Sequence, residues 1–153
     1  NTLISISSLG ALLQGQGKLD EALPLYEEAL RGRRETLGDR HPDTLISINN
    51  LGMLLNGQGK LDEALPLLEE ALRGRRETLG DRHPDTLGSI INLGLLLEDQ
   101  GKLEEALPLL EEALRGSRET LGDRHPDTLG SIINLGLLLE DQGKLEEALP
   151  LLE

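Results

Sequence analysis

LGMLLNGQGKLDEALPLLEEALRGRRETLGDRHPDTL, residues 51–87, contains most of one copy of the pattern from which the fold can be predicted. The same pattern recurs along the chain with a period of 42 residues, and residues 127–153 repeat residues 85–111 without a difference. Self-similarity at a fixed period of this length is typical of stacked arrays, in which each unit contacts only its neighbours. We therefore expect one repeat array over residues 1–153, with units at residues 1–42, 43–84 and 85–126 and a partial unit at residues 127–153.

Apolar residues recur at helical spacing in two segments of the second unit. The spacing i, i+3, i+4, i+7 runs from Leu45 to Leu55 and predicts a first helix that ends near Asn56. The same spacing predicts a second helix from Leu61 to about Leu79. Applied to every unit, the pattern predicts an all-α protein with seven complete helices and an eighth that is cut short at the C-terminal end.

Glycine and proline mark the ends and the weak points of these helices. Gly59 is the expected left-handed residue after the first helix, because Asp99 replaces its neighbour Gly57 in the next unit. Pro66 lies inside the second helix and is expected to bend it, since proline has no N–H to bond to the carbonyl of residue 62. Gly74 indicates either close packing against a neighbouring helix or fraying, and we favour close packing.

Every histidine of the chain lies in the heptapeptide DRHPDTL, which could be a metal site, a general acid/base pair or a chaperone-recruiting His-Pro-Asp turn. The heptapeptide recurs with the repeat, whereas an active site is one irregular place, so we interpret it as a boundary between helices. Gly80 ends one helix, Pro84 suits the first position of the next, and His83 lies at the N-cap or beside it. We expect no chemistry and no bound metal at His41, His83 and His125.

Composition limits the kinds of function that the chain can have. It has 28 acidic and 15 basic residues, a net charge of −13, and no cysteine, tryptophan or phenylalanine. Disulfides, thiol chemistry and cysteine-bound zinc are excluded, and no apolar run is long enough to span a membrane. The negative charge and the lack of stacking aromatics argue against nucleic acid as a partner. The lack of cysteine weakly favours the cytoplasm.

The acidity grows toward the C-terminus, and it has two interpretations. One is solubility, and the other is a basic or apolar partner. The chain also lacks an initiator methionine and ends inside a repeat, so we expect it to be a piece of a longer protein.

The repeat unit resembles the tetratricopeptide repeat, specifically the 42-residue form found in kinesin light chains. The residues that carry the resemblance are Leu51-Gly52, Gly59, Ala64, Ala71 and the runs LDEALPL and LGDRHPD. The resemblance implies a right-handed superhelical solenoid of antiparallel helix pairs. It further implies that the first helix of each unit lines a concave groove that binds an extended peptide, without a cofactor or catalysis.

Matching to the family places individual residues in that groove. Asn50 corresponds to the family asparagine that bonds to the peptide backbone, and Asn92 and Asn134 repeat it. The family lysines that clamp a C-terminal carboxylate are replaced by asparagine, methionine, isoleucine and leucine, so such carboxylates should bind poorly. Ile91, beside the dent left by Gly88, makes the third unit more apolar. The predicted groove residues are Asn49, Asn50, Met53, Asn56, Ile91, Asn92, Leu95, Glu98, Ile133, Asn134 and Leu137.

Two hypotheses for the function stay open at this point. The first is a protein-interaction scaffold that binds a peptide with basic and apolar residues. The second is a purely structural or consensus-engineered solenoid that has no specific ligand. An enzyme is not expected, because no nucleophile and base pair and no phosphate loop is present. Since both ends belong to one repeating pattern, we also expect weak head-to-tail self-association.

Overall fold

The computed structural model describes residues 2–144 and residue 146, and these residues form seven helices and no strand. They divide into two compact units, Asn1–Thr78 and Leu79–Glu153, and each unit is described by itself. The chain is all-α, as the sequence predicts. The expected eighth helix would begin near residue 145 and lies outside the described residues, except for Glu146.

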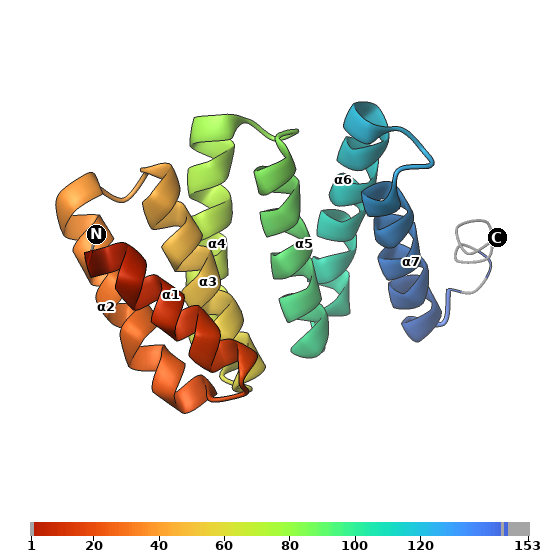
Figure 1. The fold of residues 1–153 in the computed structure, drawn as a ribbon. Helices are drawn as coiled ribbons and strands as arrows, with labels where there is room; N and C mark the ends of the chain where they lie inside the picture. The colour runs from red at the N-terminus through yellow and green to blue at the C-terminus, as the bar shows by residue number, and fades with distance from the viewer. Residues whose placement is uncertain (1, 145, 147–153) are drawn as a thin grey trace. The chain divides into compact units, whose positions relative to one another are not determined.

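The first unit contains α1 (Thr2–Gly15), α2 (Leu19–Leu37), α3 (Pro42–Gly57) and all but the last residue of α4 (Leu61–Leu79). Short turns reverse the chain between successive helices, so that α2 packs against both α1 and α3 (Figure 1). The predicted end of the first helix and both predicted bounds of the second helix agree with the structure within one residue, since α3 ends at Gly57 and α4 spans Leu61–Leu79. The helix α3 begins at Pro42, before the apolar spacing starts at Leu45.

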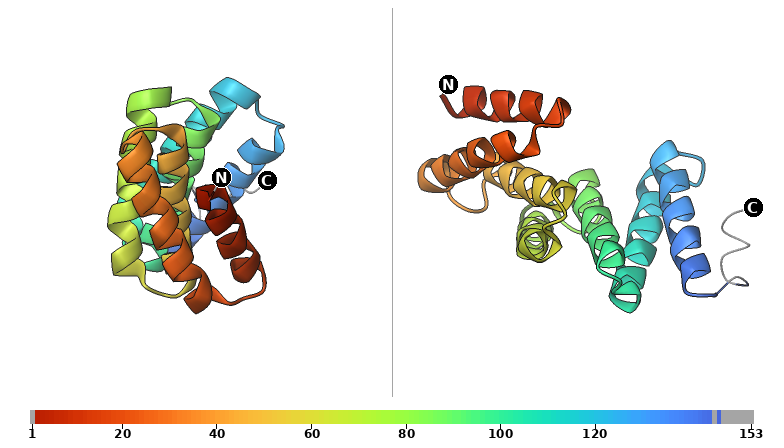
Figure 2. Two further views of the ribbon diagram at one scale, coloured as in Figure 1. Left: turned by 60° about the vertical axis from the view of Figure 1, so that its left-hand side comes forward. Right: turned by 90° about the horizontal axis from the view of Figure 1, so that it is seen from below.

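The second unit contains α5 (Pro84–Asp99), α6 (Leu103–Leu121) and α7 (Pro126–Asp141). The helix α6 packs against both α5 and α7, and the green-to-blue helices of Figure 2 show this order in the right-hand view. Thus α5 and α7 are the first helices of successive repeats, and α6 is the second helix between them. None of the helices described is long and apolar enough to cross a membrane.

The turn after each first helix is closed by a left-handed glycine. Gly59 has a φ of 79°, and the backbone N–H of Lys60 donates to the carbonyl of Leu55 at 2.9 Å. This bond is the long-range bond of a Schellman motif, which satisfies a carbonyl that the helix end leaves unpaired. Gly17 and Gly101 have the same conformation at the same place in their repeats. The assignment of Gly59 as the capping residue is confirmed.

The heptapeptide DRHPDTL forms the start of the next first helix. His83 is the N-cap residue of α5, and its Nδ1 atom accepts a hydrogen bond from the backbone N–H of Asp85 at 3.1 Å. Pro84 is the first residue of the helix, where its missing N–H leaves no bond unmade. His41 and His125 cap α3 and α7 in the same way. The interpretation of the heptapeptide as a helix boundary is confirmed.

The core of each unit consists of leucine, isoleucine and alanine side chains from both kinds of helix. In the first unit, Leu45 and Ile48 of α3 are no more than 1% exposed, and so is Leu68 of α4. Gly74 of α4 is buried, and a Cβ atom placed there would collide with Cδ2 of Leu45. Close packing, and not fraying, therefore explains this glycine. Pro66 lies inside α4, and the bend that we expect there stays a prediction.

Candidate functional site

The predicted groove residues lie on first helices, in both units. Asn49, Asn50, Met53 and Asn56 belong to α3 of the first unit. Asn50 is exposed, and the other three are half-buried. These four side chains are thus accessible to a ligand, while the buried core residues of α3 occupy other positions along the helix.

In the second unit the predicted residues come from α5 and α7. Ile133 and Leu137 of α7 are 52% and 48% exposed, so both contribute apolar surface to this helix. Asn134 of α7 is half-buried. The remaining predicted residues lie on α5 and are half-buried: Ile91, Asn92, Leu95 and Glu98.

A pocket of about 350 Å³ lies in the second unit and brings two of these predicted residues together, Ile91 and Asn134. The expected dent at Gly88 forms part of it, as does Gly130 of α7. The side chains of Ile133 and Leu137 do not line it, nor do those of Asn92, Leu95 and Glu98. We call it the Ser117 pocket; its lining residues are Pro84, Leu87, Gly88, Ile91, Ser117, Leu121, Pro126, Asp127, Gly130, Ser131 and Asn134.

Two residues of α6, Ser117 and Leu121, also line this pocket and are not among the groove residues predicted from the sequence. The sequence signal for Ser117 is a departure from the repeated pattern, because this serine stands where the first two repeats have Arg33 and Arg75. A serine on the second helix of a repeat looks like a solvated position in the sequence, but Ser117 is only 2% exposed. The pocket therefore extends from the first helices down to the second helix between them.

The C-terminal ends of α5 and α7 are negatively charged. Burial raises the pKa of the Glu98 carboxyl, and the nearby carboxylates of Asp141 and Asp99 raise it further. A carboxyl group in such surroundings is stabilised by any cation that comes close to it. This end of the second unit is therefore acidic.

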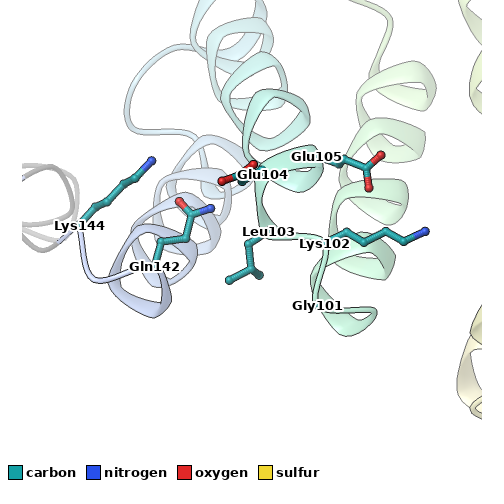
Figure 3. A pocket seen from close by; sticks show the side chains of 7 residues that line it. All are labelled: Gly101, Lys102, Leu103, Glu104, Glu105, Gln142 and Lys144. Atoms are coloured by element: carbon teal, nitrogen blue, oxygen red, sulfur yellow. The ribbon is translucent and has the colours of Figure 1, made fainter.

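Larger hollows of the structure lie at the turns between first and second helices. In the second unit such a hollow has a volume of about 650 Å³, and Figure 3 shows Glu104 of α6 and Gln142, after α7, approaching it from two sides. The equivalent residues of the first unit, Asp20 and Gln58, line a hollow of about 450 Å³, where Gln58 Nε2 donates to Asp20 Oδ1 at 2.8 Å. A hollow that recurs with the repeat is a property of the helix packing, so we do not assign a function to it.

The described residues contain no group of three or more histidine, aspartate or glutamate side chains arranged to hold a metal ion. Each histidine instead uses its Nδ1 atom to cap a helix. The geometry at these positions is that of a helix start.

Antiparallel helix pairs with a repeated sequence define the class of helical-repeat solenoids. The family model of the tetratricopeptide repeat matches residues 1–77, 48–115 and 85–153, so the chain belongs to this family. Proteins of the family generally serve as scaffolds for protein–protein interactions. Comparison with curated protein sequences found no match.

Solved structures agree with this assignment. A putative kinesin light chain with nearly identical repeats from Podosopora anserina is 31% identical, with a TM-score of 0.90 over 99% of this chain and 72% of its own. BtubC (BKLC) from P. vanneervenii is 26% identical, with a TM-score of 0.88 over 95% of this chain and 58% of its own. MamA from Desulfovibrio magneticus RS-1 is 16% identical, covers 98% of this chain and 71% of its own with a TM-score of 0.74, and supports the fold alone.

Proposed function

We propose that the chain is a protein-interaction scaffold that binds an extended peptide along the first helices of its repeats. The observation that supports this most directly is the Ser117 pocket. It opens between two successive first helices, α5 and α7, and joins an apolar side chain, Ile91, to an amide side chain, Asn134. We infer no chemistry of its own for this scaffold.

The chemistry of the peptide follows from the side chains around the pocket. Leu87, Ile91 and Leu121 form apolar walls that would bury an apolar anchor or the methylene part of a longer side chain. The amide of Asn134 offers both a donor and an acceptor, as pairing with an extended peptide backbone requires. Ile133 and Leu137 add exposed apolar surface on the same helix.

The charge of the protein favours basic residues in the peptide. The whole chain carries −13, and carboxylates gather at the ends of α5 and α7, where burial raises the pKa of Glu98 and the charges of Asp141 and Asp99 raise it further. A cationic peptide is attracted to such a surface and an anionic one is repelled. We therefore propose a ligand that combines apolar anchors with basic flanks.

A peptide-array screen of the full chain, followed by titration of the best peptide, tests the proposal. Asn92→Ala and Asn134→Ala should each weaken binding by about 0.5 to 1.5 kcal/mol, because each removes a hydrogen bond to the peptide. Gln16→Ala, in the exposed turn after α1, removes an amide away from the first-helix face and is the matched control. Unchanged affinity in both asparagine variants would exclude these residues from the site. An array without sequence preference would favour the purely structural role instead.

A further inference from the structure

Two substitutions distinguish the second helix of the third repeat from those of the first two repeats: Glu104 replaces aspartate, which keeps the charge, and Ser117 replaces arginine, which removes one. In the first unit Arg33 of α2 reaches the next first helix, where its Nη1 atom donates a hydrogen bond to Oγ of Ser47. In the second unit the two equivalent residues are Ser117 and Ser131. Ser131 is 3% exposed, and its Oγ atom is buried without a hydrogen-bond partner. The acceptor of this helix-to-helix bond is thus retained, but the arginine that donates to it is absent.

In the second unit, the space that corresponds to the Arg33 side chain is open. Two glycines stand near it at positions where the first unit has isoleucine. Gly88 and Gly130 replace Ile4 and Ile46 of the first unit. A Cβ atom on either glycine would meet no atom within 4 Å, so both face open space. The three changes converge, since Ser117 and both glycines line one pocket of about 350 Å³ together with the unpartnered Ser131.

We propose that the Ser117 pocket is a specificity site for an arginine side chain of the bound peptide. The peptide's guanidinium takes the place that Arg33 has in the first unit and donates to Ser131 Oγ. Its methylene groups pack against the walls formed by Leu87, Ile91 and Leu121. This inference rests on the proposed function, because it identifies one residue of the peptide that the scaffold binds.

The chemistry of the pocket favours arginine over the other candidates. A wholly apolar side chain would leave the hydroxyl of Ser131 buried and unpaired, which carries an energetic penalty. An anionic group would be repelled by Asp127, which lines the pocket, and by the acidity of the chain. Arginine presents several donors in a planar arrangement on a long apolar stem, whereas lysine has a compact charge that holds its water more strongly.

The test compares peptide versions and pocket variants on the full chain by fluorescence anisotropy. The best peptide from the array is made with its arginine retained or replaced by lysine or norleucine. The arginine version should bind about tenfold more tightly than the norleucine version, as expected for a hydrogen bond from a charged donor. Best binders without arginine, or equal affinity of the three versions, would overturn the inference.

Two variants of the protein locate the effect in the pocket. Ser117→Arg restores the residue of the first two repeats, so the fold should tolerate it, and it should abolish the arginine preference by filling the pocket from inside. Ser131→Ala removes only the acceptor and should reduce the preference several-fold. Arg33→Ser in the first unit is the matched control and should leave the preference unchanged. A Ser117→Arg protein that still prefers the arginine peptide would overturn the assignment.

A second probe separates failure of the pocket from failure of the proposed function. N-acetyl-arginine amide is titrated into the protein while the backbone amide signals of Gly130 and Ser131 are followed by NMR. If the array finds no peptide, the proposed function fails, but saturable shifts that disappear in Ser117→Arg would still support the arginine site. No shift in the wild-type protein would overturn it.

Discussion

Arg34 of α2 and Glu70 of α4 form a two-point ion pair that joins the second helices of successive repeats. The Nη1–Oε2 distance is 2.7 Å and the Nη2–Oε1 distance is 2.9 Å. Arg34 Nη1 also lies 2.9 Å from Oδ1 of Asp39, in the loop after α2. The hydrogen bond from Arg34 is the main cause that lowers the pKa of Glu70. Since both side chains are partly exposed, the pair should contribute modestly to the stability of the first unit.

Glu70→Gln should lower the free energy of unfolding by about 1 kcal/mol at neutral pH, because it removes the charge from a two-point pair. The lowered pKa of Glu70 means that its contribution is present above the pKa of the unfolded chain, and that it is lost as the pH falls through the folded pKa. The difference between wild type and variant should therefore shrink as the pH falls below the pKa of an unfolded glutamate, and it should disappear once the pH is below the lowered pKa of folded Glu70. Urea unfolding across pH measures it. Glu69→Gln, an exposed neighbour on the same helix, is the control, and an equal effect of both variants would contradict the prediction.

Gly74→Ala should destabilise the protein, although alanine is the better helix former. The added Cβ atom collides with Cδ2 of Leu45, a core side chain that is 1% exposed and would have to shift within the packed interior. Overpacking of this kind costs about 1 to 3 kcal/mol, which exceeds the gain in helix propensity. Gly88→Ala is the opposite case within a helix, because its Cβ meets nothing within 4 Å, and it should stabilise by up to about 1 kcal/mol. Thermal unfolding of the two variants decides, and a stabilised Gly74→Ala protein would argue against close packing.

Much of the fold was predictable because its signals are local. Gly59 has a positive φ, Pro84 is accommodated without loss of a hydrogen bond in the first turn of a helix, and His83 lies one residue before it. Each of these residues determines the conformation of the backbone next to it, so the sequence of a single repeat is enough to predict where its helices begin and end. Gly74 is an intermediate case, since the sequence indicated close packing but could not identify Leu45 as the neighbour.

The candidate site was only partly predictable, because it depends on contacts between helices. Ile91 and Asn134 follow from matching to the family, and both line the Ser117 pocket. The role of Ser117 depends on Ser131, fourteen positions later on another helix, and on the hydrogen bond that Arg33 makes in the first unit. The spacing of apolar residues predicts which face of one helix is buried. It does not predict that residues of α5, α6 and α7 lie close enough to line one pocket.

Binding of a basic peptide should weaken as the pH falls. This loss of affinity should begin at a higher pH than it would for a glutamate with an ordinary pKa. Burial and the carboxylates of Asp141 and Asp99 raise the pKa of Glu98. Only the ionised form attracts a cation, so affinity should increase as the pH rises through this raised pKa. Glu98→Gln should lower the affinity at neutral pH and remove that step from the pH profile. Glu111→Gln removes one charge from an exposed position of α6 and should retain the step. Identical profiles for the two variants would exclude Glu98 from the binding surface.

Replacement of the three histidines should affect stability only through the helix caps. Nδ1 of His41, His83 and His125 accepts a backbone hydrogen bond at 3.1 Å in each case. Asparagine caps helices well, so the triple variant with asparagine should retain its stability within about 1 kcal/mol for each cap, whereas alanine should cost about 0.5 to 2 kcal/mol at each position. Urea unfolding with zinc and with a chelator provides the measurement. Peptide affinity should be the same in wild type and in the asparagine variant, because the caps do not line the Ser117 pocket. Zinc-dependent stabilisation of the wild type that is absent from the asparagine variant would show that the histidines bind metal after all.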